Sequence, residues 1–235
     1  MKDILSTALF GVMISIIAFE IGLFINRKTK KSYLNPLLLA IVIVIIVLKT
    51  FDIDLEDYKR GGSLISFLLA PATVVLAVPL YKNFELLKKN ALPIIAGIFA
   101  GCVVSITSII LLAKTFKLDA ILSLSLIPKS VTTPIGVEVS KQIGGVPEIT
   151  IAAIVITGIS GAVMAPMVFS ALKIKDKVAI GIAMGTTSHA LGTAKAIEMG
   201  EIEGGMSGLS IGVAGLITVV IAPIIVKVFQ YLSII

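Results

Sequence analysis

The sequence has little charge and few of the residues that build disulfides or metal sites. Charged residues make up 14% of the 235, against about a quarter in a soluble domain. There is no tryptophan, one histidine and one cysteine. A single cysteine excludes an intramolecular disulfide, so Cys102, which lies in an apolar run, is expected to be a small core residue. One His, one Cys and scattered acids offer no metal-ligand spacing, and neither a metal nor another cofactor is expected.

Long apolar runs are what the chain has in abundance. Hydrophobic residues make up 57% of it, and the mean hydropathy is +1.09. Four runs approach the roughly 20 apolar residues that cross a bilayer: 4–25, 92–113, 149–172 and 206–229. The first is too long, and too weakly charged at its start, for a cleaved signal peptide. We predict one all-α, polytopic membrane domain over 1–235 with six to eight crossings, in which 1–60 form N-terminal spans and 61–235 a transport core with internal repeats.

The charges gather in short segments between the runs. Three segments are basic and two are acidic: 26–33, 81–90 and 173–177, and 51–57 and 198–205. Basic loops stay on the cytoplasmic side, so the net charge of +6 indicates membrane orientation rather than nucleic-acid binding. This assignment requires an even number of crossings between Asp119 and Glu148. We predict a re-entrant hairpin there, tipped at "LIPKSVTTPIG" (126–136); the alternative is that the charge rule fails at one loop.

A faint internal repeat supports interrupted elements. When the sequence is shifted by 57 residues, several special residues coincide: Thr73 with Ser130 and Thr187, Pro71 with Pro128 and Gly185, Gly101 with Gly158 and Gly215, and Asp119 with Asp176. The repeated unit would be an interrupted, hydroxyl-bearing element followed by a continuous helix. Neighbouring units that each cross an odd number of times are inverted, and inverted repeats with discontinuous helices at the midplane recur in transporters.

The first interrupted stretch is "LLAPATVVLAVPLY" (68–81). Its two prolines, Pro71 and Pro79, remove backbone donors and disfavour the preceding helical turn. Irregular backbone at membrane depth survives only inside protein or beside a water-filled cavity. Two interpretations follow: a proline-kinked span, or a cavity wall shaped by Pro71 and Thr73.

The second stretch, 126–136, holds the sharpest feature of the chain, Lys129. An ionisable group inside the bilayer is costly and usually has a partner or faces a polar cavity. Around it stand hydroxyls and two helix-interrupting prolines: Ser130, Thr132, Thr133, Pro128 and Pro134. An ammonium, hydroxyls and a half-helix that begins near Pro134 predict a site for a small anion. The alternatives are that Lys129 reaches the membrane interface or forms an ion pair with Glu138 or Glu148.

The third stretch, 185–201, carries the only histidine, His189. Hydroxyls and two glycines that loosen the backbone surround it: Thr186, Thr187, Ser188, Thr193, Gly185 and Gly192. His189 could couple a proton to transport, contact the substrate, or be a buried residue satisfied by a hydrogen bond. Lys195 and Glu198 have the i, i+3 spacing of a helical ion pair.

No pattern of catalytic residues is found. Ser188–His189 and Lys129–Ser130 are neighbours in sequence rather than the spatial nucleophile–base pairs that catalysis requires. No Gly-rich loop follows a strand. The protein is therefore not expected to be an enzyme.

Three stretches carry a resemblance to a known family. "LLAPATVVLAVPLY", "IPKSVTTPIGVEVS" and "GTTSHALGTAKAIEMGEIEGGMSGLSIGVAGLIT" resemble the LrgB/CidB family of bacterial membrane proteins, in order and over nearly the whole chain. The resemblance implies a multi-pass protein of the bacterial plasma membrane with a smaller holin-like partner of the LrgA/CidA type. Members are named as antiholin-like regulators of murein hydrolase export; a plastid relative carries glycolate and glycerate, and bacterial pairs are connected with pyruvate.

The anion site and the resemblance together predict transport of a small monocarboxylate such as pyruvate, lactate, glycolate or glycerate. Lys129 would supply charge; hydrogen bonds would come from Ser130, Thr132, Thr133, Thr187 and Ser188, and His189 and Thr193 would line the site. The alternatives are an antiholin-like regulator of cell lysis with no small-molecule substrate, and a structural membrane subunit. A homodimer is expected because the i, i+4 spacing of Gly97 and Gly101 permits close helix packing.

Overall fold

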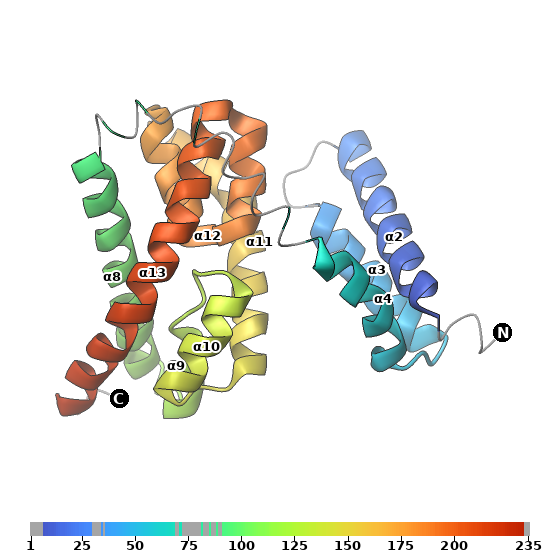
Figure 1. Ribbon diagram of the computed structural model, residues 1–235, viewed down its shortest axis with the longest axis horizontal. Helices are drawn as coiled ribbons and strands as arrows, with labels where there is room; N and C mark the ends of the chain where they lie inside the picture. The colour runs from blue at the N-terminus through green and yellow to red at the C-terminus, as the bar shows by residue number, and fades with distance from the viewer. Residues whose placement is uncertain are drawn as a thin grey trace. The chain divides into compact units, whose positions relative to one another are not determined.

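The computed structural model describes residues 7–29, 34, 36–68, 71, 81, 85, 88 and 91–232, and all elements within these residues are helices (Figure 1). The all-α prediction is confirmed. The helices form two compact units, residues 1–75 and 76–235. The subdivision expected from the sequence placed its boundary at residue 60, which lies inside helix α4 (Leu55–Phe67).

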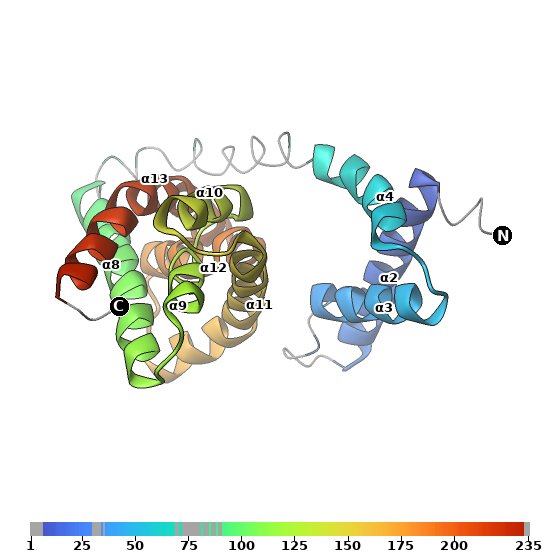
Figure 2. The same cartoon turned by 90° about the horizontal axis from the view of Figure 1, so that it is seen from below.

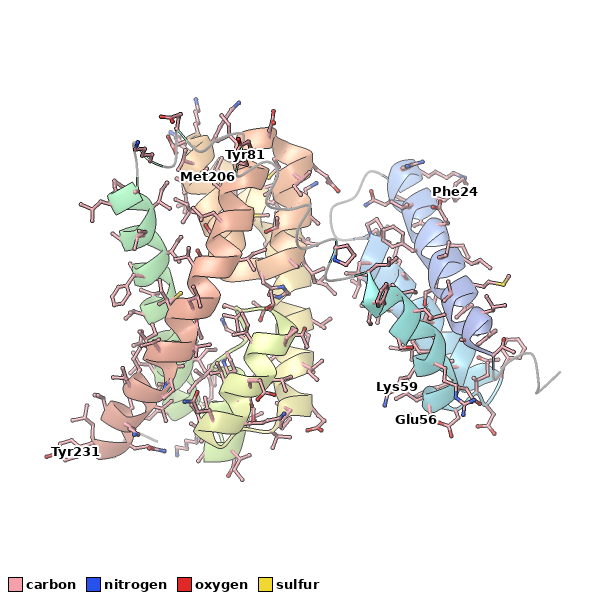
Figure 3. All side chains as sticks on the ribbon, viewed as in Figure 1. Phe24, Glu56, Lys59, Tyr81, Met206 and Tyr231 are labelled. Carbon is pink, nitrogen blue, oxygen red and sulfur yellow. The ribbon has the colours of Figure 1, made fainter. Side chains whose placement is uncertain are left out.

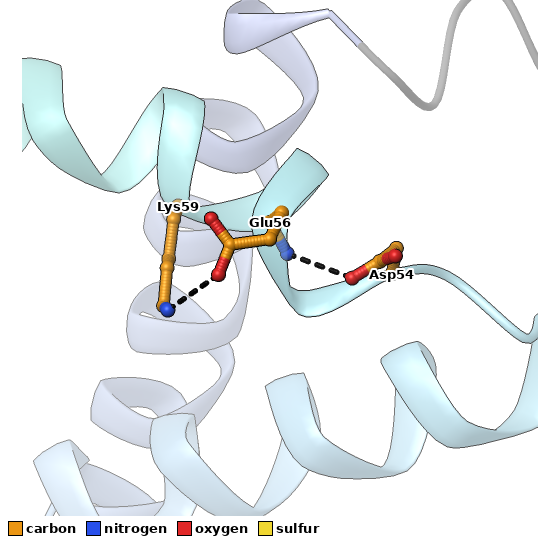
Figure 4. Close-up of polar contacts among 3 residues, drawn as sticks. All are labelled: Asp54, Glu56 and Lys59. Carbon is orange, nitrogen blue, oxygen red and sulfur yellow. Dashed lines mark hydrogen bonds and ion pairs between the residues drawn. The ribbon is translucent and has the colours of Figure 1, made fainter.

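The first unit contains α2 (Ala8–Thr29), α3 (Pro36–Thr50) and α4, with α3 and α4 both packed on α2. Asp54 caps α4 by accepting a hydrogen bond from the Glu56 backbone N–H at 3.0 Å, and Lys59 pairs with the Glu56 carboxylate at 2.6 Å (Figure 4). The acidic segment predicted as a loop over 51–57 therefore ends at Asp54, because its last residues form the first turn of α4.

Two glycines let α2 and α4 approach closely. A Cβ on Gly11 would lie 2.9 Å from the Gly61 Cα, so only hydrogen fits there. Beside this contact the hydroxyls of Ser15 and Tyr58 lie 2.9 Å apart. Close backbone approach through small residues, reinforced by a hydrogen bond, is how helices associate where lipid removes the hydrophobic driving force.

The second unit is built on three long helices, α8 (Ala91–Thr115), α11 (Pro147–Ala171) and α13 (Glu201–Tyr231). Together with α2 they are the four described helices that are long and apolar enough to cross a membrane, and α3 is a shorter apolar helix. A 25-residue helix is about 37 Å long, which exceeds the roughly 30 Å of bilayer hydrocarbon. Met206 and Tyr231 lie toward opposite ends of α13 in Figure 3.

The predicted re-entrant hairpin is confirmed. It consists of α9 (Ala120–Leu126), a tip at 127–132 and α10 (Thr133–Ile143). Its two arms are tied at the base, where the Val146 backbone N–H donates to the Ser125 hydroxyl at 2.8 Å. Leu124 and Ile143 share one core cluster with Ile110 near the end of α8. The hairpin therefore enters and leaves at the end of the unit where α8 stops.

The third interrupted stretch is a second hairpin. Helix α12 (Lys177–Met199) has a non-helical residue inside it, His189, with φ 42° and ψ −135°. Beyond that point the chain doubles back: Ala196 packs in a cluster with Ile180 and Met184. Residues 16 positions apart would be about 24 Å apart in a straight helix, so α12 is two half-helices that meet at His189.

The two hairpins enter from opposite ends of the second unit. Gly97 and Gly101 of α8 lie beside Ile182 and Thr186, so the first arm of α12 runs parallel to α8 from the end where α8 begins. In Figure 1, α9 and α10 lie toward one end of the second unit and α12 toward the other, and Figure 2 shows α8, α11 and α13 around them. A hairpin followed by a long helix occurs twice in opposite directions, as α9–α10 with α11 and as α12 with α13, which confirms the inverted repeat for these two units. The interrupted element of the first predicted unit, 68–81, lies mostly outside the described residues.

Several boundaries differ from the prediction. The acidic segment 198–205 is not a loop, because only Gly200 separates α12 from α13.

Gly101 packs against Thr186 within the chain, so its small size is explained without a second copy, and the homodimer stays a prediction. Pro71 is described as an exposed residue, whereas Thr73 lies outside the described residues together with most of 68–81.

Candidate functional site

The tips of both hairpins lie near the middle of the long helices. Ser105 and Thr218, which border the first tip, are close to the midpoints of α8 and α13. His189 at the second tip contacts Gly158, close to the midpoint of α11. Two interrupted segments thus meet at mid-depth, where a hydrocarbon environment would leave their backbone groups unsatisfied unless they line a polar space.

Lys129 is the only cation at the first tip. Its ammonium donates to the hydroxyls of Ser105 and Ser130 at 3.4 and 3.3 Å, and these hydroxyls lie 3.0 Å from each other. Neither contact brings a negative charge. Of the two acids predicted as alternative partners, Glu138 pairs with Lys141 at 2.8 Å, and no described carboxylate pairs with Lys129. The half-buried Lys129 amine thus contacts two hydroxyls and no described carboxylate.

A helix N-terminus faces the same tip. Thr132 is the N-cap of α10 with extended backbone, and Pro134 lies in the first turn, as the sequence predicts. Thr132 makes no side-chain capping bond, and Pro134 has no N–H to donate. The first-turn N–H groups lack intrahelical partners and carry the positive end of the helix dipole. The second arm of α12 likewise begins at the opposite tip, after His189.

A small cavity joins the two tips. It has a volume of about 10 Å³ and is lined by Pro128 and Ser130 from the first tip, Thr186 from the second, and Ser105 and Thr218 from the long helices. This volume is at the lower limit for one water molecule. A larger groove of about 600 Å³ runs between α8 and the first arm of α12, and Thr186 lines it as well.

The predicted residues of the second tip are divided among different surroundings. Thr187 is exposed and lines the large groove, with its hydroxyl bonded to the Ala183 carbonyl at 2.7 Å. His189 is buried, and its Nε2 lies 3.0 Å from the Ile154 carbonyl oxygen of α11. The Thr193 hydroxyl lies 2.7 Å from that of Ser207 on α13.

Most of the residues predicted around the second tip are engaged in hydrogen bonds or close packing. Ser188 bonds to the Thr187 hydroxyl at 3.1 Å and packs against Gly161 of α11. His189 makes the hydrogen bond that one of its three interpretations predicted; proton coupling and substrate contact stay predictions. The helix-breaking glycines serve packing, since Gly185 meets the Ser207 backbone and Gly192 meets Met184. Lys195 and Glu198 form the predicted ion pair at 2.8 Å.

Two residues at the site are absent from the set predicted from sequence, Ser105 and Thr186. Ser105 lies in a continuous apolar helix, where no pattern distinguishes a site serine from one that bonds its own backbone. Thr186 had a signal: the 57-residue shift that aligns Ser130 with Thr187 also aligns Lys129 with Thr186. By this shift Thr186 is equivalent to Lys129, whose neighbours Pro128 and Ser130 line the small cavity from the first tip while Thr186 lines it from the second.

These features define a class: a polytopic membrane protein with inverted repeats, in which two re-entrant hairpins meet at mid-depth beside a lysine that pairs with no described carboxylate. Sequence comparison then gives the family. The chain belongs to the LrgB-like family, which matches residues 15–228.

Three similar proteins share one name. The chain is 40% identical over 219 residues to the antiholin-like protein LrgB of Bacillus subtilis (strain 168), a match that covers 93% of this chain and 95% of the relative. Antiholin-like proteins LrgB of Bacillus mycoides (strain KBAB4) and Bacillus cereus (strain B4264) are 37% identical over 218 residues, 92% of this chain and 95% of each relative. The name is not that of an enzyme. No solved structure matches the chain.

Proposed function

We propose that the protein carries a small monocarboxylate across the bacterial plasma membrane and binds it at the Lys129 tip. The observation that carries the proposal is the ammonium of Lys129, which lies at mid-depth among hydroxyls and pairs with no described carboxylate. Pyruvate, lactate, glycolate and glycerate each offer one carboxylate for the charge and an oxygen for the hydroxyls.

The physical reason is the missing counter-charge. A charge removed from water without a partner is costly, and it persists where a function needs it. A carboxylate at the tip would supply the charge and accept hydrogen bonds from Ser105 and Ser130. Because the effective dielectric constant is lower at this depth, the attraction would be stronger than in water.

The cavity at the tip is too small for such an anion, so binding requires the two tips to separate. Inverted repeats provide for this, since rocking one repeat against the other opens a central site to either side. The 600 Å³ groove beside α8 is within the size range of ligand pockets, roughly 300–1,000 Å³.

A second function is favoured by a different observation, the name antiholin-like protein carried by relatives that align with nearly the whole chain. In that case the protein regulates murein hydrolase export and cell lysis, and has no small-molecule substrate. Both functions include assembly with a holin-like LrgA/CidA-type partner. They differ in whether Lys129 binds a carboxylate as part of the function.

The test is carboxylate binding to purified protein. A charge-assisted hydrogen bond contributes about 1.5–3 kcal/mol, roughly one to two decades of affinity. Lys129→Ala should therefore weaken pyruvate binding by about that factor, and Lys129→Arg should restore only part, because a planar fork does not replace a compact ammonium. Isothermal titration in detergent measures both.

Lys141→Ala is the matched control, because it removes an exposed charge from the same hairpin and should leave binding unchanged. Unchanged binding in a folded Lys129→Ala protein would overturn the proposed site. Liposomes with and without the holin-like partner separate the two functions: saturable pyruvate flux supports a carrier, and leakage of large dyes supports a lesion-forming assembly.

A further inference from the structure

Two buried side-chain oxygens among the described residues make no hydrogen bond, Thr186 Oγ1 and Glu203 Oε2, and of the two only Thr186 lines the cavity between the hairpin tips. Its side chain is 4% exposed, and no described residue makes a hydrogen bond with its Oγ1. Threonine in a membrane helix ordinarily satisfies its hydroxyl by bonding a carbonyl of the preceding turn, as Thr187 does with Ala183. A buried hydroxyl without a partner costs about 1–3 kcal/mol, so its retention calls for an explanation.

The position of Thr186 supplies one. The residue lies at the inner end of the first arm of α12 and lines the small cavity together with Ser105 and Ser130, the two hydroxyls that receive the Lys129 ammonium. Its methyl group is directed at α8, since a Cβ on Gly101 would lie 2.9 Å from Cγ2. It also lines the larger groove. Thr186 therefore separates a space large enough for an organic acid from the charged tip.

The repeat gives independent support. Thr186 is the residue of the second hairpin that aligns with Lys129 of the first. In inverted-repeat proteins the ligand lies at the interface between repeats and is held from both sides. Without Thr186, the polar groups around the cavity would come only from the first hairpin, α8 and α13, and the second hairpin would contribute none.

We propose that Thr186 is the ligand that the second hairpin contributes to the anion site, so that the carboxylate bound by Lys129 is also held by the Thr186 hydroxyl. The inference rests on the proposed carboxylate function and adds the second half of its site. Entry is from the groove between α8 and α12, and the bound anion spans both repeats.

Thr186→Val tests the hydroxyl at constant shape. One neutral hydrogen bond contributes about 0.5–1.5 kcal/mol, so pyruvate should bind roughly 2- to 12-fold more weakly to this variant. Thr186→Ser keeps the hydroxyl and should stay within about twofold of wild type. Thermal stability of Thr186→Val should be equal or higher, because the variant removes an unsatisfied buried group. A structural role for the hydroxyl predicts the reverse, lower stability with unchanged affinity.

A second measurement reports where the anion binds, without comparing the affinities of variants. In a Cys102→Ser background, Thr186→Cys should react with a small anionic thiol reagent through the groove, and pyruvate should slow the reaction. Val104→Cys, on an exposed part of α8 outside the groove, is the control whose rate pyruvate should not change. Protection of the residue 186 thiol, but not of the control, supports the inference.

The outcomes separate the two proposals. If wild-type protein binds pyruvate and Lys129→Ala loses it, the carboxylate function stands. Unchanged affinity in Thr186→Val together with no protection at residue 186 then overturns the role of Thr186 alone. If wild-type protein binds none of the four carboxylates, the proposed function and this inference are both wrong.

Discussion

Buried hydroxyls fall into two groups at the residue scale. Thr150 belongs to the first: it is completely buried, donates to the Ser125 carbonyl at 2.8 Å, and lies 2.7 Å from the Ser140 hydroxyl. These contacts join α9, α10 and α11 at the base of the first hairpin. Thr186 belongs to the second group, because its hydroxyl has no partner among the described residues. Hydroxyls that make hydrogen bonds hold the hairpins in place, and the Thr186 hydroxyl, which makes none with a described residue, lies at the space between them.

Thr150→Val should therefore destabilise the protein. The change keeps the shape but leaves the Ser125 carbonyl and the Ser140 hydroxyl short of a partner, which should cost about 1–2 kcal/mol. Unfolding of the detergent-solubilised protein by sodium dodecyl sulfate measures the loss. Thr107→Val is the control, since the Thr107 hydroxyl bonds only carbonyls of its own helix. Equal stability of the two variants would contradict the cross-linking role of Thr150.

At the scale of elements, the hairpins are packed through glycine. The first arm of α12 lies against α13 at Gly181 and Gly185, where an added Cβ would overlap the backbone carbonyls of Glu203 and Ser207. Gly192 gives the same freedom within the hairpin, against Met184. Apolar side chains gain little from packing on one another in lipid, so close backbone contact provides the attraction. These glycines fix how deeply the second hairpin enters the bundle.

Gly185→Ala and Gly212→Ala should consequently have opposite effects on stability. At Gly185 the methyl group meets backbone that cannot rotate away, and overpacking of this kind costs about 1–3 kcal/mol. At Gly212 of α13 nothing lies within 4 Å, so the better helix propensity of alanine should add about 0.5–1 kcal/mol. Thermal unfolding of both variants in one detergent tests this. Similar melting temperatures would show that α12 is not seated on α13 at residue 185.

At the scale of the whole molecule, opposed hairpins fix which segments share a side of the membrane. The first hairpin returns to the end where α8 stops, so Lys117 and Gln142 lie on one side. The second returns to the end where α8 begins, so Lys175 and Glu198 lie on the other. By the positive-inside rule, the basic segment 173–177 predicts that this second side faces the cytoplasm.

Labelling of single cysteines tests this topology. In a Cys102→Ser background, Lys117→Cys and Gln142→Cys should both react with an impermeant thiol reagent in intact cells. Lys175→Cys and Glu198→Cys should react only after permeabilisation. Asp54→Cys, in the acidic segment of the first unit, is expected to react from outside. If Lys117→Cys and Gln142→Cys were labelled from opposite sides, the first hairpin would be a crossing.

The sequence by itself determined the class and much of the topology. Long apolar runs require spanning helices, since every backbone group must be satisfied inside the segment. Charge between the runs predicted an even number of crossings over 119–148 and so favoured the hairpin over a failure of the charge rule at one loop. The 57-residue shift indicated the inverted repeat, and Asp119 and Asp176, which it aligns, both cap the first arm of a hairpin by accepting a backbone N–H bond.

Only the tertiary structure decided which polar residues share the site. His189, Ser188 and Thr193 stood out in sequence, yet each is hydrogen-bonded toward a neighbouring residue or helix. Ser105 carries no distinguishing pattern and Thr186 only its alignment with Lys129, and both lie at the cavity between the tips. The reason is physical: periodicity and charge report on the environment along one helix. Whether a hydroxyl meets an ammonium, a carbonyl or nothing depends on side chains brought beside it from segments tens of residues away.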